Sequence, residues 1–135
     1  MKPKILRNGP VNSKEICALR TAVGWDAADG TYDDILKKLY AYYTVRNDGS
    51  ELIGYVSVLS DGIADAFLID LMVHPEHQES GLGIRIVRKA ASDVKQAGIQ
   101  CIQVTFDDSL EPFYRKCGFH IFRGGIIDFK NMAWD

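Results

Sequence analysis

The sequence has 135 residues; 47% of them are hydrophobic, 25% are charged, and the formal net charge is −2. This length suits one domain with its own core, here residues 1–135, and the charge balance gives no general attraction for nucleic acid or an anionic membrane. No apolar run reaches the length of a membrane span, and the first residues lack the apolar centre of a signal peptide. We therefore expect a single cytoplasmic domain with no nucleic-acid or membrane partner.

The first quarter of the chain predicts a short strand followed by two helices. Residues 4–7 favour a strand, and Asn12 or Ser13 is suited to cap a helix that ends at Gly24. Thr31 is expected to cap the second helix, whose first turn carries acidic residues that favour the helix dipole.

A hairpin follows these helices. Residues 40–46 and 51–59 are expected to pair as strands across a turn at 47–50, with a bulge at Gly54. A turn at 60–62 then leads into the next strand, so two hairpin-linked strands precede the centre of the chain.

The centre of the chain combines a strand, a glycine-bearing turn and a helix. An apolar strand ends at Val73, because Pro75 lacks the amide that a strand ladder needs. Gly81 and Gly83 follow, and residues 84–97 have a helical pattern. The apolar face of this helix is expected to contain Ile84, Val87, Ala91 and Val94. Free N–H groups at the start of such a helix form a ready site for a phosphate.

Three phosphate-binding motifs can be compared with this turn. A P-loop needs a lysine after its last glycine, and none follows Gly83. A Rossmann fingerprint needs a third glycine where this chain has Ile86. The segment Gln78-Glu-Ser-Gly81-Leu-Gly83 matches Gln-x-x-Gly-x-Gly at every fixed position, directly after a strand. The third motif is therefore the one that fits.

The last third of the chain predicts a parallel strand and a short helix. Gly98 is expected to end the preceding helix, and residues 99–106 to form a strand parallel to the central one. Ser109 is suited to cap a helix that ends at Gly118. Two further strands are expected to close the sheet, at residues 119–122 and 126–132.

The three cysteines, Cys17, Cys101 and Cys117, show no Cys-x-x-Cys spacing. Their number and spacing predict neither a disulfide framework nor a zinc site. We expect reduced thiols, as in a cytoplasmic protein, and no metal.

These features resemble the GNAT superfamily of N-acetyltransferases. Its pyrophosphate loop has the Gln/Arg-x-x-Gly-x-Gly/Ala pattern found at 78–83, and its closing signature is similar to Phe113-Tyr114-Arg-Lys-Cys-Gly118-Phe119. The chain departs from the family at Asp107, where many members have Asn. It also departs at Glu79, where Gly is frequent. Because a carboxylate here would lie beside the proposed anion site, the Glu79 side chain is expected to point outward.

The resemblance implies an α+β fold in α/β/α layers. The mixed central sheet would have about six to seven strands and be flanked by about four helices. Its first half would be antiparallel, and its fourth and fifth strands would be parallel and splayed apart.

The resemblance also implies acetyl-coenzyme A as the acyl donor. Backbone groups of Leu71, Met72 and Val73 would bind the pantetheine arm, and one of these amides would polarise the acetyl oxygen. Tyr114 would contact the coenzyme and give a proton to the departing sulfur. The other expected coenzyme contacts are Gln78, Glu79, Ser80, Gly81, Leu82, Gly83, Ile84 and Asp107.

The sequence does not identify the general base. Phe67 and Ile69 are apolar, although family members often carry a carboxylate or histidine on this strand. Asp70 is then either the base that takes the proton of the amine or a structural carboxylate that binds a neighbouring loop. The sequence leaves both roles open.

The acceptor is expected to be a small-molecule amine, with a cationic amine favoured. Residues 25–34 include four acidic residues and no basic one, and such a segment attracts cations. Trp25 either walls the acceptor pocket, where a cation can contact its ring, or packs in the core. Two other functions stay open: a GNAT module that binds acetyl-coenzyme A or a partner without turnover, and acetylation of a protein amine. A homodimer is compatible with each.

Overall fold

The computed structural model describes residues 2–134. The chain divides into two compact units, residues 1–104 and 105–135, and each is described by itself. The elements of the first unit are β1 (Ile5–Arg7), α1 (Ser13–Ala22), α2 (Tyr32–Lys38), β2 (Ala41–Arg46), β3 (Leu52–Ser60), β4 (Asp65–Val73), the 3-10 turn η1 (Pro75–His77), α3 (Leu82–Gln96) and β5 (Cys101–Val104).

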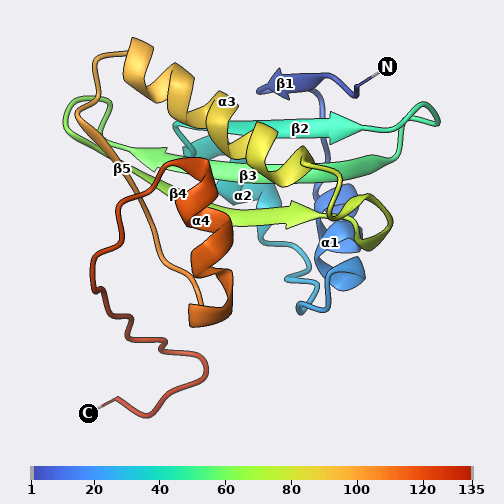
Figure 1. The fold of residues 1–135 in the computed structure, drawn as a ribbon. Coiled ribbons are helices and arrows are strands. Elements are labelled where there is room, and N and C mark those ends of the chain that lie inside the picture. The colour runs from blue at the N-terminus through green and yellow to red at the C-terminus, as the bar shows by residue number, and fades with distance from the viewer. Residues whose placement is uncertain (1, 135) are drawn as a thin grey trace. The chain divides into compact units, whose positions relative to one another are not determined.

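The strands form one sheet whose order follows the chain, β1-β2-β3-β4-β5 (Figure 1). Neighbouring strands from β1 to β4 are antiparallel, whereas β4 and β5 are parallel, from Asp65 opposite Cys101 to Leu68 opposite Val104. The predicted antiparallel first half and the parallel fourth and fifth strands are confirmed. The strand β5 is shorter than predicted, and β4 continues beyond it to Val73.

The hairpin of β2 and β3 has the predicted turn and bulge. In the turn, the N–H of Ser50 donates to the carbonyl of Asn47 at 3.0 Å. Val45 faces Gly54 but Arg46 faces Leu52, so one extra residue of β3 is inserted beside Gly54.

The starts of the first two helices differ in how they are capped. Asn12, rather than Ser13, caps α1 with a complete capping box. Its side chain accepts from the Glu15 N–H at 2.9 Å, and the Glu15 carboxylate accepts from the Asn12 N–H at 3.1 Å. Thr31 occupies the N-cap position of α2, as predicted, but its side chain does not cap the helix, because its hydroxyl donates to the carbonyl of Ala28 at 2.6 Å instead.

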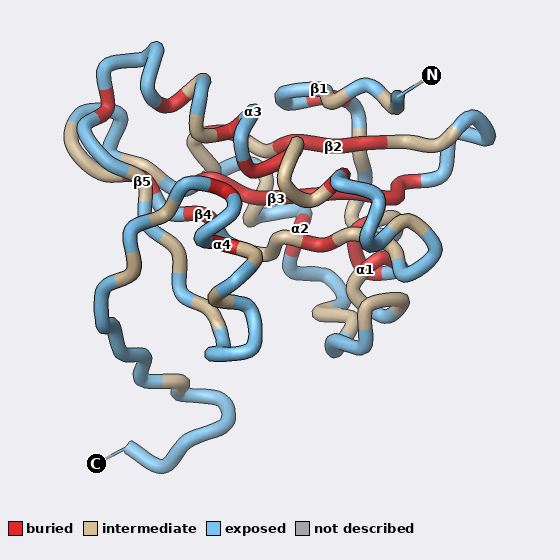
Figure 2. The backbone as a smooth tube through the Cα atoms, in the orientation of Figure 1, coloured by how far each residue is buried: buried red, intermediate tan, exposed pale blue. Residues whose placement is uncertain are grey.

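Helices cover both faces of the sheet. Figure 1 shows α3 crossing one face, with α1 and α2 behind the other. Figure 2 shows the buried residues concentrated in β2, β3 and part of α3. The core on the side of α1 and α2 contains Ile16, Cys17, Leu19, Tyr32, Leu52, Tyr55 and Met72. The predicted layers are therefore confirmed.

The helix α3 buries a face slightly different from the predicted one. Ile84 and Ala91, which were expected in the core, are only half-buried. The buried residues are Leu82, Ile86, Val87, Ala90 and Val94. The buried face includes Ile86 because Gly54 of β3 carries no side chain and leaves room beneath that residue. Contact with β3 therefore sets which side of the helix faces inward.

The second unit contains one α-helix among its described residues. The 3-10 turn η2 (Asp108–Leu110) leads into α4 (Glu111–Cys117), which has Pro112 in its first turn. The helix ends before Gly118, whose φ is +106°, as predicted. Ser109 does not cap this helix, because it lies inside η2.

Residues 119–134 form no strand, so the strands predicted at 119–122 and 126–132 are wrong. The sheet therefore has five strands within residues 2–134, fewer than expected. A strand needs a partner for its backbone and a core for its apolar face. The apolar side chains here stay in solvent: Phe122 is 83% exposed and Phe129 is 76% exposed.

Candidate functional site

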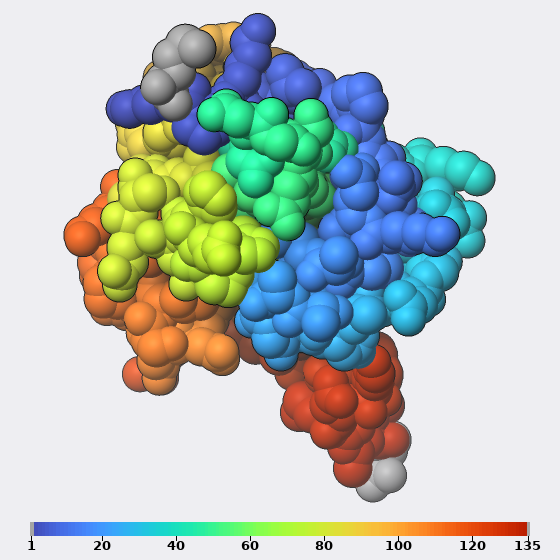
Figure 3. Space-filling view, turned by 90° about the vertical axis from the view of Figure 1, so that its right-hand side faces the viewer, coloured from blue at the N-terminus to red at the C-terminus, as the bar shows by residue number. Residues whose placement is uncertain are grey.

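The loop between β4 and α3 folds back on the end of β4. The side-chain amide of Gln78 donates to the carbonyl of Val73 at 2.9 Å, so the first residue of the motif ties the loop to the strand. Ser80 donates to the carbonyl of His77 at 2.5 Å. Figure 3 shows this loop, in yellow-green, at the surface beside the β2–β3 turn in green and the chain around α1 in blue.

The loop enters α3 through two left-handed residues, Glu79 with φ +63° and Gly81 with φ +84°. A Cβ on Gly81 would meet nothing within 4 Å, so the backbone angle, not lack of space, favours glycine there. The N–H groups of Leu82, Gly83 and Ile84 open the helix and have no partner in a preceding turn. Together with the dipole of this 15-residue helix they form a site for an anion.

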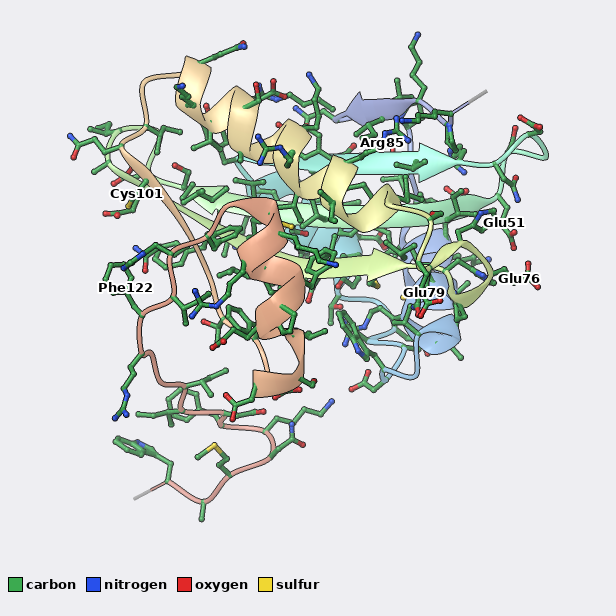
Figure 4. The ribbon with its side chains drawn as sticks, in the orientation of Figure 1. Glu51, Glu76, Glu79, Arg85, Cys101 and Phe122 are labelled. Atoms are coloured by element: carbon green, nitrogen blue, oxygen red, sulfur yellow. The ribbon has the colours of Figure 1, made fainter. Side chains whose placement is uncertain are left out.

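Two basic residues of α3 are already bound within the protein. Arg85 Nη2 donates to the carbonyl of Pro3 at 2.9 Å, and Figure 4 shows this side chain directed toward the start of the chain. Lys89 pairs with Asp93 one turn along the helix, at 3.2 Å. Glu79 is exposed. Arg85 and Lys89 are thus engaged elsewhere, and the anion site at the start of α3 is formed by backbone N–H groups.

The strand β4 carries a bulge at Asp70. Between Tyr55, which faces Met72, and Ser57, the register shifts so that two residues of β4 oppose one residue of β3. Asp70 lies in this bulge with φ +60°, a backbone conformation that few residues other than glycine adopt.

The end of β4 has no partner on the side of β5. Parallel pairing stops at Leu68 and Val104, so Leu71, Met72 and Val73 have no β5 residue opposite them. The backbone groups that point to this side are available to a ligand. These are the residues at which the pantetheine arm is expected to bind.

Arg20 of α1, Tyr32 of α2 and Asp70 of β4 form one hydrogen-bonded group, which we call the Asp70 cluster. The Tyr32 hydroxyl donates to Asp70 Oδ2 at 2.7 Å. Arg20 Nη1 lies 3.0 Å from the Tyr32 hydroxyl and 3.6 Å from Asp70 Oδ1. Burial first, and then the Asp70 carboxylate, raise the pKa of Tyr32, so this phenol stays a donor at neutral pH. Both oxygens of Asp70 therefore have partners from the first half of the chain.

Arg20 also holds the segment after α1. Its Nε donates to the carbonyl of Asp26 at 2.6 Å, and its guanidinium carbon lies 5.3 Å from the centroid of the Trp25 ring. Trp25 is 41% exposed, so it is not a core residue. The cation that its ring contacts is Arg20 of the same chain.

Sequence reasoning did not select Arg20 or Tyr32 as site residues. The available signal was Arg20 on the same side of its helix as the apolar residues Ile16 and Leu19. At such a position the charged group of the arginine is largely removed from water, and it then needs a hydrogen-bonding or ionic partner. Tyr32 gave no signal, because a tyrosine at the start of a helix is ordinary.

Tyr114, in the second unit, packs among phenylalanines. Its ring stacks on Phe106 with centroids 4.6 Å apart and meets Phe113 and Phe119 edge-on at 5.0 and 5.7 Å. Burial, with a further contribution from Cys117, raises the pKa of Tyr114 to about 12, so the phenol keeps its proton at neutral pH. Asp107 is exposed, and its carbonyl accepts the N–H of Leu110 at 2.8 Å to begin η2.

The described residues, 2–134, include no helix long and apolar enough to cross a membrane. They also include no group of three or more His, Cys, Asp or Glu side chains that could hold a metal ion.

The fold and the loop together define a class: a mixed sheet between helices, with an anion site at the start of the helix that follows the central strand. Residues 38–121 match the family model of the acetyltransferase (GNAT) domain. The chain belongs to this GNAT family of acetyltransferases.

Known relatives agree with this assignment. An uncharacterized N-acetyltransferase of Pyropia yezoensis, ycf52, is 27% identical over 131 residues, which cover 94% of this chain and 74% of the relative. For three curated relatives, the aligned part covers from 50% to 74% of the relative's own length.

Two solved structures show the same fold. A GNAT-family acetyltransferase of Streptococcus pneumoniae has a TM-score of 0.80 at 24% identity, covering 97% of this chain and all of that one. The GNAT-family N-acetyltransferase YhbS of Escherichia coli, solved in complex with CoA, has a TM-score of 0.71 at 20% identity, covering 87% of this chain and 68% of that one.

Proposed function

We propose that this protein transfers the acetyl group of acetyl-CoA to a primary amine by direct attack in a ternary complex. The observation that carries the proposal is the start of α3, where left-handed Gly81 leads into the free N–H groups of Leu82, Gly83 and Ile84. These groups suit a pyrophosphate. Membership of the GNAT family, and the CoA complex of the structural relative YhbS, support CoA as the carrier.

The open end of β4 suits the rest of the donor. An extended pantetheine arm with amide groups can bind strand-like to the backbone groups of Leu71, Met72 and Val73 that β5 leaves unpaired, other than the Val73 carbonyl, which already accepts from Gln78. An N–H donor in this stretch would stabilise the negative charge that develops on the acetyl oxygen.

The reaction forms a C–N bond and breaks the C–S bond of the thioester. We assign the protonation of the leaving thiolate to Tyr114, whose phenol keeps its proton at neutral pH. The attacking amine loses a proton, which we assign to water because both oxygens of Asp70 already have partners. Solvent then returns a proton to Tyr114, and the products are an amide and free CoA.

We further propose a small cationic amine as the acceptor and the reducing cytoplasm as the location. Asp26, Asp29, Asp33 and Asp34 are all exposed on the segment that follows α1. Such a charge cluster raises the local concentration of cations. An alkyl amine titrates near 10.4, so it arrives protonated and must lose that proton before attack.

Release of free thiol from acetyl-CoA, measured against a panel of cationic, neutral and acidic amines, tests the proposed function. The expected result is release that depends on the amine and is fastest with a cationic one. CoA binding without release for any amine, including lysine peptides, would contradict catalysis and leave a non-catalytic binding module. Release that is fastest with lysine peptides would contradict only the proposal of a small-molecule acceptor and would leave the transferase activity supported.

A further inference from the structure

We propose that Arg20 and Tyr32 are positioning residues that act through Asp70: they hold the β4 bulge, and with it the backbone amides of Leu71 and Met72, in the geometry that the acyl donor needs. This inference rests on the proposed function, because it concerns how that same site is built. Of the two roles that the sequence left open for Asp70, general base or structural carboxylate, it assigns the structural one.

The first argument is the backbone of Asp70. Its φ of +60° is unfavourable for a residue with a Cβ, so the bulge needs support from the side chain or its surroundings. Asp and Asn tolerate this conformation best among non-glycine residues, because their short polar side chains can form hydrogen bonds. The Tyr32 hydroxyl supplies such a bond at 2.7 Å, and Arg20 adds an ion pair at 3.6 Å.

The second argument is the rigidity of Tyr32. Its side chain is 1% exposed, and its ring meets the ring of Tyr55 edge-on, with centroids 6.3 Å apart. Tyr55 lies directly opposite Met72, the residue that follows the bulge formed by Asp70 and Leu71. The donor that fixes Asp70 is therefore itself fixed by the core beneath the same stretch of β4.

The third argument is the set of elements that Arg20 connects. It lies on α1, donates to the carbonyl of Asp26, contacts the ring of Trp25, and reaches both Tyr32 and Asp70. The acidic segment proposed to receive the amine is thus joined through one guanidinium to the strand proposed to receive the thioester. Correct relative placement of two reactants contributes strongly to catalysis, and a misplacement of about 1 Å can cost roughly a hundredfold.

The variant Tyr32→Phe tests the proposal, because it keeps the buried ring and removes only the hydroxyl. The chain offers a matched control, Tyr43→Phe: Tyr43 is also 1% exposed, and its hydroxyl donates to Asp93 at 2.8 Å, away from β4. Both variants are expected to lose stability. Only Tyr32→Phe is expected to lower kcat, by roughly tenfold to a hundredfold, and any loss of CoA affinity should likewise be confined to this variant. Unchanged kcat in Tyr32→Phe, or an equal loss in Tyr43→Phe, would overturn the proposal.

A second variant separates positioning from base catalysis. Glycine adopts a positive φ without support, so Asp70→Gly should make the bulge independent of Tyr32. Adding Tyr32→Phe to Asp70→Gly should then change kcat by less than about twofold, a non-additivity that a double-mutant cycle measures. A full further loss in the double variant would overturn the proposal. Asp70→Asn, which still accepts a hydrogen bond, should keep kcat within about tenfold; complete loss would instead identify Asp70 as the base.

One readout does not depend on turnover. Amide hydrogen exchange at residues 70–72 should be faster in Tyr32→Phe than in the wild type and unchanged in Tyr43→Phe. If the wild type acetylates no amine, the proposed function fails while this measurement still decides the positioning role. Unchanged exchange at residues 70–72 in Tyr32→Phe would overturn that role even in an active enzyme.

Discussion

Gly54 of β3 lies directly beneath Ile86 of α3: a Cβ on Gly54 would come within 2.7 Å of Ile86 Cδ1 and 3.3 Å of Val45 Cβ. Ile86 and Val45 are both buried, so a Cβ on Gly54 would have to displace side chains within the core. The start of α3, with its anion site, is therefore seated on the sheet through the smallest residue available.

Gly54→Ala should lower the free energy of unfolding by about 1–3 kcal/mol, as overpacking in a core typically does. Urea unfolding measures this change. Gly49→Ala is the control, because a Cβ there would make only an ordinary contact, 3.5 Å from Asn47 Oδ1. Equal stability of the two variants would show that α3 adjusts freely over β3.

Gly81→Asp should weaken CoA binding by at least tenfold, which corresponds to about 1.4 kcal/mol. The substitution strains a backbone at φ +84° and places a negative charge at the start of α3. Gly98→Asp has the same kind of strain, at φ +83°, and equally open surroundings, but lies at the other end of the helix. Calorimetric titration measures the CoA affinity of both variants. Wild-type affinity in Gly81→Asp would refute the assignment of the loop as the CoA site.

Tyr114→Phe should lower kcat by roughly a hundredfold or more and leave CoA affinity unchanged, as expected when a general acid is lost. The ring remains among Phe106, Phe113 and Phe119, so the fold should be retained. Steady-state kinetics with a fast acceptor gives the measurement. If kcat is retained, water or another group protonates the thiolate.

Alkaline pH should destabilise the protein partly through Tyr114. Its folded pKa is about 12 because of burial, whereas a phenol in an unfolded chain titrates near 10. The contribution of this group is therefore fully present below pH 10 and is lost as the pH rises toward 12, by up to about 1.4 kcal/mol per pH unit. Urea unfolding at pH 8 to 11 should show a smaller decline in Tyr114→Phe than in the wild type; parallel declines would argue against the shift.

Salt should slow the acetylation of cationic amines more than that of neutral ones. Surface charge acts over about 8 Å at physiological ionic strength, so the attraction exerted by the exposed acidic residues 26–34 should weaken as salt is added. Values of kcat/KM at several salt concentrations test this, with a neutral amine as the reference. A kcat/KM for cationic amines that does not respond to salt would remove the support for electrostatic selection.

The parts of the protein that the sequence predicted are those encoded locally. Asn12 and Glu15 form their capping box within one helical turn, and Gly81 belongs to a motif that directly follows its strand. Neither feature depends on distant segments. The same holds for the turn at 47–50 and for the end of α4 at Gly118.

Apart from the side-chain caps expected at Thr31 and Ser109, which failed within their own turns, the parts that failed depend on partners far along the chain. The tail at 119–132 is rich in apolar residues, but its sequence does not reveal whether a neighbouring strand is present to pair with it. Asp70 looked equally suited to catalysis and to structure, because Tyr32 lies 38 positions away in sequence. The buried face of α3 was misjudged in part, since Gly54 belongs to a different element.

The order of the sheet has a consequence for how the chain folds. The meander of β2, β3 and β4 consists of two hairpins, whose pairing closes short loops and favours rapid folding. The pairings of β1 with β2, from Ile5 opposite Val45, and of β4 with β5, from Asp65 opposite Cys101, close long ones. The contacts of Tyr32 with Asp70, of Tyr43 with Asp93 and of Arg85 with Pro3 span 38, 50 and 82 positions. These long closures have the highest entropic cost, so we expect the meander to form first and the joining of its helices to complete the native state.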